Sequence, residues 1–186
     1  MSTAAPITIL ALSGSLRRQS TNTALLRAAG PLLPAGASLV LHGLADIPLY
    51  DDDVRQQGYP APVEALRRAI AAADAVLIAT PEYNRSFSGV LKNALDWVSR
   101  PPSAPLAGKA VGVVGVSPGA LGTGIAHYQL KHVLTAMGAF VIPGAEVMVG
   151  HSAQKFDTEG RLTDEATQKF LAAHLERLID LARRLR

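Results

Sequence analysis

The chain has 186 residues, of which 48% are hydrophobic and 18% charged, with a formal net charge of +3 and no cysteine. This composition excludes a largely disordered chain, and the absence of cysteine excludes disulfides, thiolate nucleophiles, iron–sulfur clusters and cysteine-based metal sites. No apolar run approaches the roughly 20 residues of a membrane span, and the dispersed basic residues disfavour nucleic acid as a partner. We therefore expect one domain over residues 1–186, with residues 1–6 disordered, and a cytoplasmic location.

The hydrophobic pattern predicts strands that alternate with helices. Short β-branched or continuous apolar runs mark the strands, and apolar residues at helical spacing mark the helices. The segment Asp46–Asp53 is predicted to be a loop, because Pro48 and the aspartate run disfavour regular structure. In the last helix, Thr163 is the expected N-cap and Phe170 is expected in the buried stripe. The predicted strands are 7–12, 37–42, 75–80, 110–116 and 140–142, and the predicted helices are 24–33, 60–73, 91–98, 130–137 and the segment after 163.

This alternation predicts a parallel sheet with helices on both faces and right-handed crossovers. Five strands with a polar turn after the first favour a flavodoxin-like three-layer α/β fold with strand order 2-1-3-4-5. In that order, the ligand crevice lies at the carboxyl ends of strands 1 and 3. The loops after Leu12, Thr80 and Val116 are therefore expected to meet at one site.

The first of these loops, residues 12–22, is rich in hydroxyl groups and contains Arg17 and Arg18. Backbone N–H groups at the start of the following helix, together with its dipole, make such a turn a natural anion site. The hydroxyls and a guanidinium add donors, so the expected ligand is a phosphate monoester. The alternative is a plain strand-to-helix turn in which Ser20 or Asn22 caps the helix.

The second loop starts at Pro81 and runs to Gly89. Tyr83 offers a flat apolar face with a polar tip. The backbone amides of this loop, with Asn84, suit hydrogen bonding to the edge of a flat heteroaromatic ring. The alternative is a surface loop that leads into a capped helix.

Three motifs lie in and between these loops. They are Gly14-Ser15-Leu16-Arg17-x-x-Ser20-x-Asn22, Pro48-Leu49-Tyr50-Asp51-x-Asp53 and Pro81-Glu82-Tyr83-Asn84-x-Ser86-x-x-Gly89-x-Leu91-Lys92-Asn93-Ala94-x-Asp96-Trp97. Together they resemble the NADPH-dependent FMN reductase family, and within it the branch of quinone and chromate reductases. The resemblance covers residues 7–185, and its third motif is long and specific.

The resemblance implies that the chain binds FMN. It assigns the FMN phosphate to the first loop, the edge of the isoalloxazine ring to the second loop, and a hydroxyl contact to Ser117. Close relatives often carry an aromatic residue in place of Arg85 and a basic residue in place of Ile125, near the substrate mouth or the subunit contacts. The implied phosphate-binding residues are Ser13, Gly14, Ser15, Leu16, Arg17, Ser20 and Asn22, and the implied ring-binding residues are Pro81, Glu82, Tyr83, Asn84 and Arg85.

The resemblance also implies an FMN-dependent NAD(P)H oxidoreductase. NADPH or NADH would deliver hydride to FMN and leave, and a quinone, or a similar acceptor such as chromate, an azo compound or free flavin, would then be reduced in the same place. Because the cofactor carries this chemistry, no catalytic side chain and no metal is expected. A homodimer or homotetramer is expected, since a second subunit can cover the exposed face of the flavin, with 91–98 and 130–137 as candidate interface helices.

Two alternative functions come from other classes of protein. Residues 115–119 match the nucleophile elbow of serine hydrolases, with Asp157 or Asp164 and His174 further on, but Pro118 lacks the N–H that an oxyanion hole uses. The second alternative is a flavodoxin-type electron carrier. Such carriers are usually strongly acidic, whereas this chain carries a formal charge of +3.

Overall fold

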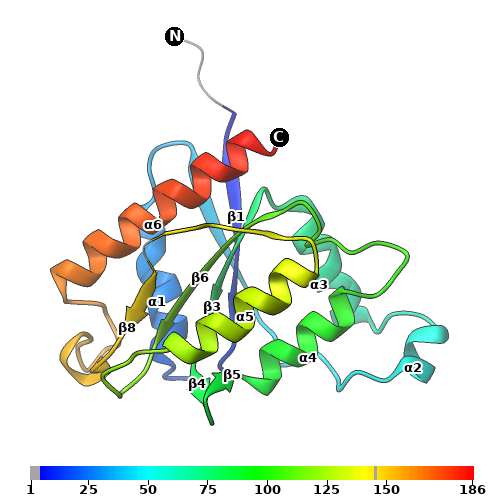
Figure 1. The fold of residues 1–186 in the computed structure, drawn as a ribbon, viewed down its shortest axis with the longest axis horizontal. Coiled ribbons are helices and arrows are strands. Elements are labelled where there is room, and N and C mark those ends of the chain that lie inside the picture. Colours follow the sequence, from blue (N-terminus) through cyan, green and yellow to red (C-terminus); the bar gives the residue numbers. More distant parts are fainter. Residues whose placement is uncertain (1–4, 145) are drawn as a thin grey trace.

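The computed structural model describes residues 5–144 and 146–186, and its centre is a parallel sheet covered by helices (Figure 1). The strand order is β2-β1-β3-β6-β7, and β8 also pairs with β6. The strands are β1 (Ile7–Ser13), β2 (Ala37–His42), β3 (Ala75–Ala79), β6 (Ala110–Val116), β7 (Phe140–Val141) and β8 (Val147–Val149), with a separate hairpin of β4 (Glu82–Tyr83) and β5 (Ser86–Phe87). The helices are α1 (Thr21–Ala29), α2 (Asp52–Gln56), α3 (Ala61–Ala72), α4 (Gly89–Val98), α5 (Gly124–Ala136) and α6 (Glu165–Arg184), with short 3-10 turns η1 (Gly30–Leu32) and η2 (Ser152–Gln154).

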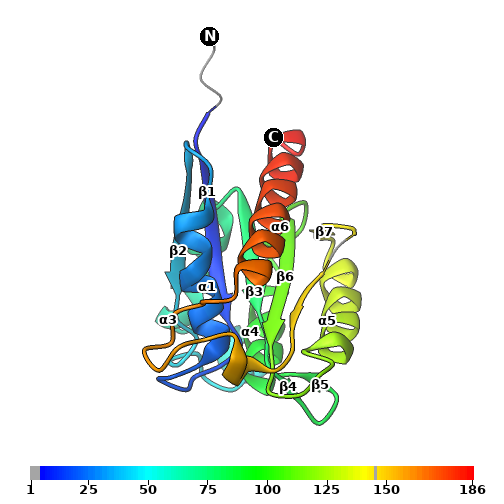
Figure 2. The same ribbon diagram turned by 90° about the vertical axis from the view of Figure 1, so that its left-hand side faces the viewer.

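Helices cover both faces of the sheet, so its central strands β3 and β6 are buried along their whole length. This burial explains why both strands are unbroken apolar runs in the sequence. One hydrophobic cluster joins the sheet to α1 and α6 through residues such as Leu25 and Leu175. The other joins it to α3, α4 and α5 through Leu66, Leu95 and Leu130. Figure 2 shows α1 and α5 on opposite sides of β6.

The predicted α/β fold and the strand order 2-1-3-4-5 are confirmed, with one difference in the fifth strand. Its position is shared by β7, which pairs with Ala110 and Val111, and by β8, which pairs with residues 114–116. Pro143 follows β7 closely. Because proline has no N–H for the ladder, the strand stops there and pairing resumes only at β8.

The loop predicted over Asp46–Asp53 is wrong at its end, because α2 begins at Asp52. Asp51 is the N-cap, and its carboxylate accepts a hydrogen bond from the Asp53 backbone at 2.9 Å. Asp52 and Asp53 lie in the first turn, where the helix dipole favours negative charge. The aspartate run that disfavoured a helix interior is therefore a helix start.

Two predictions for the last helix are also wrong. The N-cap of α6 is Asp164 rather than Thr163, and its carboxylate accepts a hydrogen bond from the Thr167 backbone at 2.9 Å. Either residue type can cap a helix, and the chain enters the helix one residue later than predicted. Phe170 is 64% exposed, because the buried face of α6 runs through Thr167, Leu171 and His174 instead.

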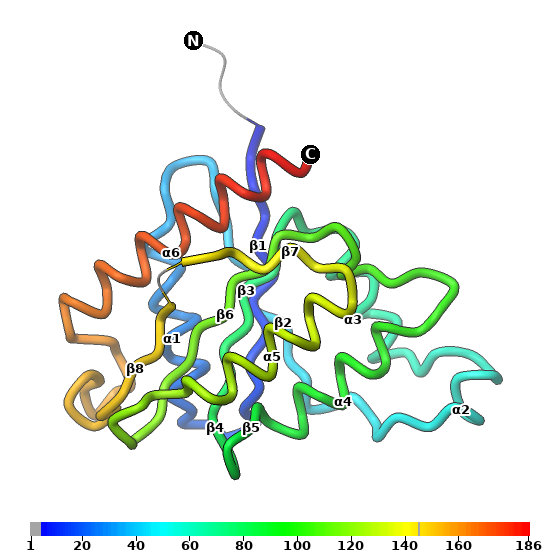
Figure 3. The backbone as a smooth tube through the Cα atoms, in the orientation of Figure 1, coloured from blue at the N-terminus to red at the C-terminus, as the bar shows by residue number. Residues whose placement is uncertain are grey.

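The start of β1 and the C-terminus lie at one end of the molecule, and the loops that follow β1, β3 and β6 lie at the other (Figure 3). The predicted disorder of residues 1–6 falls mainly on residues 1–4, which lie outside the described residues, and Pro6 accepts a hydrogen bond from Arg186 at 2.6 Å. Among the residues that are described, no helix is long and apolar enough to cross a membrane.

Candidate functional site

The three loops that were predicted to meet do come together at the carboxyl end of the sheet. The Gly14 N–H donates to the Ala79 carbonyl at 2.7 Å, and a Cβ at Gly14 would lie 2.7 Å from the Ser88 hydroxyl oxygen. Gly115 is enclosed as tightly, because a Cβ there would lie 2.7 Å from the Thr80 carbonyl oxygen. Glycine at these two positions lets the ends of β1, β3 and β6 approach one another.

Two serines of the first loop hold the start of α1. The Ser20 hydroxyl accepts a hydrogen bond from the Thr23 backbone at 3.3 Å and is the N-cap, as the alternative interpretation of this loop predicted. The Ser13 hydroxyl lies 2.8 Å from the Thr23 hydroxyl and accepts a hydrogen bond from the Ser15 backbone at 3.3 Å. These side chains fix the path of the loop between strand and helix.

Asn22 has a structural task that the sequence did not reveal. Its side-chain amide donates to the Val116 carbonyl at 2.9 Å and accepts from the Val116 N–H at 2.9 Å. The Asn22 side chain is buried, and the two bonds tie α1 to the last residue of β6. In this arrangement, Asn22 joins the first loop to the third.

The first loop still offers free donors. Within the described part of the chain, the backbone N–H groups of Leu16, Arg17 and Arg18 make no hydrogen bond, and neither guanidinium forms an ion pair. The N-terminal end of α1, with its partial positive charge, follows directly. Free N–H groups, a helix N-terminus and two cations form the donor set that a phosphate monoester requires, so the loop fits the predicted FMN phosphate.

The second loop contains a β-hairpin that was not predicted. The antiparallel strands β4 and β5 are joined by Asn84-Arg85, which have φ angles of 50° and 64°. Positive φ at both positions matches a type I′ turn. Asparagine tolerates this conformation, whereas arginine is strained in it, so Asn84 was the available sequence signal for the turn. Tyr83 is 51% exposed beside the turn and leaves a flat ring free for a ligand.

Glu82 ties this hairpin to α5. One carboxylate oxygen accepts hydrogen bonds from the Ile125 backbone at 3.0 Å and from the Ala126 backbone at 3.1 Å. These are first-turn N–H groups of α5, whose own N-cap residue, Thr123, makes no capping hydrogen bond through its side chain. The carboxylate therefore neutralises the positive end of the helix from a neighbouring loop.

Ser117, the predicted residue of the third loop, is held by its own loop. Its hydroxyl donates to the Gly122 carbonyl at 2.5 Å, and its backbone N–H donates to the Val149 carbonyl at 2.9 Å. The third loop is thereby fastened to β8. Because Ser117 follows the last residue of β6, it lies at the same end of the sheet as the first two loops.

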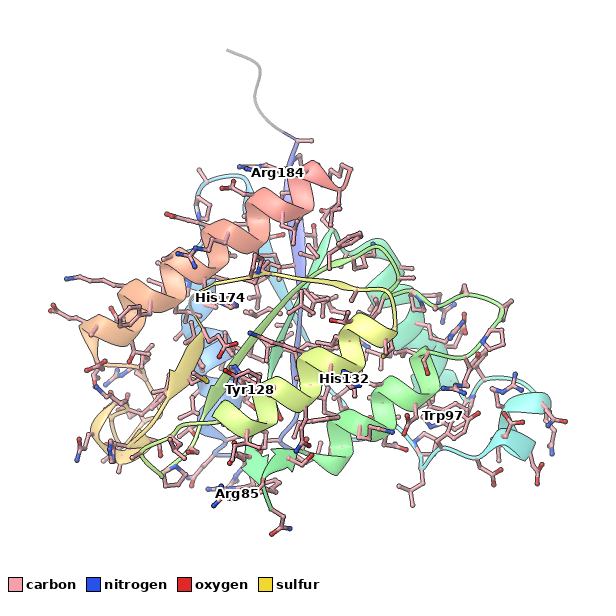
Figure 4. The ribbon with its side chains drawn as sticks, viewed as in Figure 1. Arg85, Trp97, Tyr128, His132, His174 and Arg184 are labelled. Carbon is pink, nitrogen blue, oxygen red and sulfur yellow. The ribbon has the colours of Figure 1, made fainter. Side chains whose placement is uncertain are left out.

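The serine hydrolase alternative fails on geometry. The ring of His174 lies over Gly112, since a Cβ at Gly112 would lie 2.8 Å from the His174 Nε2 atom. Gly112 lies within β6, five residues before Ser117, which follows the end of this strand, and five residues correspond to about 16 Å at the usual rise of a strand. Asp164 caps α6 and pairs with Lys155 instead. Figure 4 shows His174 on α6, away from the hairpin that carries Arg85.

His127 lies on α5 close behind the third loop, and its side chain is fully buried. A contact with the Val114 backbone favours the protonated ring, but burial outweighs it. Burial lowers the pKa of His127 to about 4, although the nearby Glu146 carboxylate opposes this shift. Glu146 is paired with Lys131, so only part of its charge acts on the ring. His127 is therefore neutral at pH 7 and belongs to the packing of α5 on the sheet.

The described residues contain no group of three or more histidine, cysteine, aspartate or glutamate side chains that could hold a metal ion. The chemistry that this end of the sheet supports is recognition by hydrogen bonds and cations. The first loop contributes hydrogen-bond donors that suit a phosphate, and the β4–β5 hairpin contributes the exposed aromatic ring of Tyr83.

A family model described as NADPH-dependent FMN reductase matches residues 7–154. An NAD(P)H-dependent FMN reductase of Pseudomonas aeruginosa is 44% identical over 180 residues, which cover 97% of each chain. A quinone reductase of Escherichia coli K12 is 43% identical over 170 residues, which cover 90% of each chain.

A solved structure also matches this chain over nearly its whole length. The flavoenzyme NAD(P)H:(acceptor) oxidoreductase FerB of Paracoccus denitrificans matches with a TM-score of 0.87 and 35% identity, covering 96% of this chain and 98% of that one. The match covers nearly the whole of both chains, so the two proteins share the fold.

Proposed function

Because the chain belongs to the NADPH-dependent FMN reductase family and is an FMN-dependent NAD(P)H oxidoreductase, we propose that it reduces quinones at the carboxyl end of its sheet. The observation that carries this proposal is the meeting of the first two loops, where the Gly14 N–H bonds the Ala79 carbonyl. That contact brings the phosphate-type donors and the exposed ring of Tyr83 to one site. The quinone reductases among the relatives support the choice of acceptor.

The FMN phosphate is assigned to the first loop. Its direct contacts are the N–H groups of residues 16–18 and the Arg17 guanidinium, which are free of partners within the described chain. Ser13 and Asn22 act on the phosphate through the shape of the loop, because their side chains already bond to protein. The Ser20 hydroxyl only accepts a hydrogen bond from the Thr23 backbone, so its O–H can still donate to the phosphate. We therefore propose a supporting role for Ser13 and Asn22, and keep Ser20 as a phosphate contact, as the resemblance implied.

The isoalloxazine ring is assigned to the second loop, Pro81–Arg85, with Ser117 at the edge of the pocket. Bound FMN supplies the group that takes hydride from NAD(P)H and passes it to the acceptor. The chain itself orients the ring: Tyr83 provides a wall, and the backbone of the β4–β5 hairpin faces the ring edge. None of these side chains has to transfer a proton, so their contribution is position and exclusion of water.

A second copy of the chain is proposed to close the site. A groove of about 630 Å³ runs beside β5 between α4 and α5, and Phe87, Tyr128 and Val133 are among its lining residues. Tyr128 is 72% exposed and lies on α5 close to His132 (Figure 4). Exposed aromatic surface next to a ligand site is typical of a subunit contact. Sedimentation at micromolar protein should show a dimer or tetramer, and a monomer alone would contradict this part.

The decisive experiment is a spectrum followed by steady-state kinetics. Purified protein should show flavin absorbance bands and release FMN on denaturation, and it should oxidise NADPH or NADH with a quinone as the sole acceptor. Absence of flavin bands after FMN is added would overturn the proposal. NAD(P)H oxidation that required an added redox protein would instead indicate the electron carrier that the sequence left open.

We also propose that residues 1–186 form one domain and that the protein is cytoplasmic. Both hydrophobic clusters pack on the same sheet, which supports a single domain. Limited proteolysis tests the first statement, since one domain should yield no stable half. Cell fractionation tests the second.

A further inference from the structure

Gln129 of α5 bridges to the turn of the β4–β5 hairpin. Its side-chain Nε2 donates to the Arg85 carbonyl at 2.8 Å, and its Oε1 accepts a hydrogen bond from the Ser86 hydroxyl at 2.6 Å. Among the described residues, no other side chain hydrogen-bonds to residues 83–87. Gln129 therefore supplies the outside support of this turn, together with Glu82 at the base of the hairpin.

The turn needs such support because its geometry is unfavourable for its residues. Arg85 has a φ of 64°, a left-handed conformation that is sterically unfavourable for a residue with a Cβ atom. Conformations of this kind persist only where the surroundings fix them, and they cluster at functional sites. The Arg85 carbonyl belongs to the strained residue itself, so its bond to Gln129 acts directly on the orientation of the turn.

The helix that carries Gln129 is a rigid reference. Ala126, Leu130 and Leu134 of α5 are fully buried against the sheet, so α5 cannot shift without disturbing the core. Glu82 bonds the backbone of residues 125 and 126, one turn before Gln129. Two successive turns of α5 thus hold the base and the tip of the hairpin.

We propose that Gln129 is a positioning residue that sets where the Asn84-Arg85 turn meets the edge of the flavin ring. It touches neither the flavin nor the acceptor, and it acts through the Arg85 carbonyl and the Ser86 hydroxyl. This inference rests on the proposed function, in which residues 81–85 hold the isoalloxazine. Gln129 lies outside the three sequence motifs that resemble the family.

The test compares Gln129→Met, which keeps the length of the side chain but removes both hydrogen bonds, with Ser86→Ala and with the double variant. Gln129→Met should raise the FMN dissociation constant about five- to tenfold, the range of one net hydrogen bond. It should also change the flavin midpoint potential and lower kcat/KM for a quinone. Since both single changes remove the same contact, the double variant should be little worse than Gln129→Met. Gln129→Glu, which retains the acceptor for Ser86, should recover part of the loss.

Gln168→Met is the matched control. Gln168 also lies on a helix and donates to a backbone carbonyl, that of Leu162 at 2.8 Å, but on α6. It should share any small loss of melting temperature and leave the flavin potential unchanged. If Gln129→Met behaves like Gln168→Met in potential, FMN affinity and kcat/KM, the positioning role is wrong. If the wild-type protein fails to bind FMN, the proposed function fails first, so the two failures are distinguishable.

Discussion

The first loop and the β4–β5 hairpin form two sides of one site but are held in different ways. The first loop is fastened by buried side chains, Asn22 and Ser20, which are 4% and 5% exposed. The hairpin is fastened from α5 by Glu82, which is half-buried, and by Gln129, whose bonds are exposed. Hydrogen bonds shielded from water contribute more than exposed ones, and their loss leaves unpaired groups. Damage to the first loop should therefore appear as lost stability, and damage to the hairpin as altered affinity and rate.

The largest expected effect is a loss of folding stability at acidic pH. It tests whether α5 and the hairpin unfold before α1. His127 has a pKa near 4 in the folded protein, below its ordinary value of 6.5. A depressed histidine pKa means that the unfolded chain binds the proton more readily, so stability is full above pH 6.5 and falls as pH drops towards 4. The loss below pH 4 amounts to about 3 kcal/mol. The facing charged groups, Glu146 and Lys131, are paired with each other.

Urea unfolding at a series of pH values measures this slope. His127→Gln removes the titrating group and should flatten the slope between pH 6.5 and 4. Hydrogen exchange near pH 4.5 should show α5 and the hairpin opening before α1. If the amides of α1 and α5 are equally protected from exchange, the proposed difference in stability between the first loop and the hairpin is wrong.

Asn22→Ala should show the second-largest effect. It removes both hydrogen bonds to Val116, whose N–H and carbonyl are buried at the end of β6. Leaving these groups unpaired should lower the free energy of unfolding by about 2–3 kcal/mol. Urea midpoints measure the change, and Gln168→Met, which removes one part-buried hydrogen bond, serves as the comparison. A stable Asn22→Ala protein with weak FMN binding would mean that Asn22 contacts the phosphate directly.

Much of this architecture was predictable from the sequence because apolar runs and helical spacing report burial. The parallel order and the meeting of the three loops followed from that pattern. The hairpin did not, because two residues per strand carry no periodicity and its turn contains Asn84-Arg85 rather than an Asn-Gly pair. The tasks of Asn22 and Glu82 were missed for another reason. Each of these side chains hydrogen-bonds a backbone group that is distant in sequence. Because nearly every residue type carries the same backbone groups, the sequence does not identify the partner.

Arg17→Ala should have a smaller effect, confined to the ligand. The Arg17 guanidinium forms no ion pair within the described chain, so its removal should leave the fold intact. A charge-assisted bond to the FMN phosphate is worth about 1.5–3 kcal/mol, and FMN binding should weaken by about 2 kcal/mol within that range. Fluorescence titration of the apoprotein measures this, with Arg184→Ala in the last turn of α6, at the opposite end of the molecule, as control. Unchanged affinity would assign the phosphate to Arg18 and the backbone.

Arg85→Gly should have the smallest effect on stability, and it should have the opposite sign. Glycine adopts a φ of 64° without strain, so the substitution removes a local penalty at the hairpin tip. The same change enlarges the freedom of the unfolded chain, which opposes the gain, so a net stabilisation of about 0.5 kcal/mol is expected.

FMN binding by Arg85→Gly separates the role of the backbone of residue 85 from that of its side chain. The Gln129 bond to the carbonyl of residue 85 survives in Arg85→Gly, so FMN affinity should stay near wild type. Asn84→Gly is the matched variant, and its gain should be smaller because asparagine already tolerates positive φ. Differential scanning calorimetry gives the stabilities, and kcat/KM for neutral and anionic quinones gives the rates. If Arg85→Gly destabilises the protein by more than 1 kcal/mol, the side chain of Arg85 supports the fold, and the hairpin is then held by more than α5.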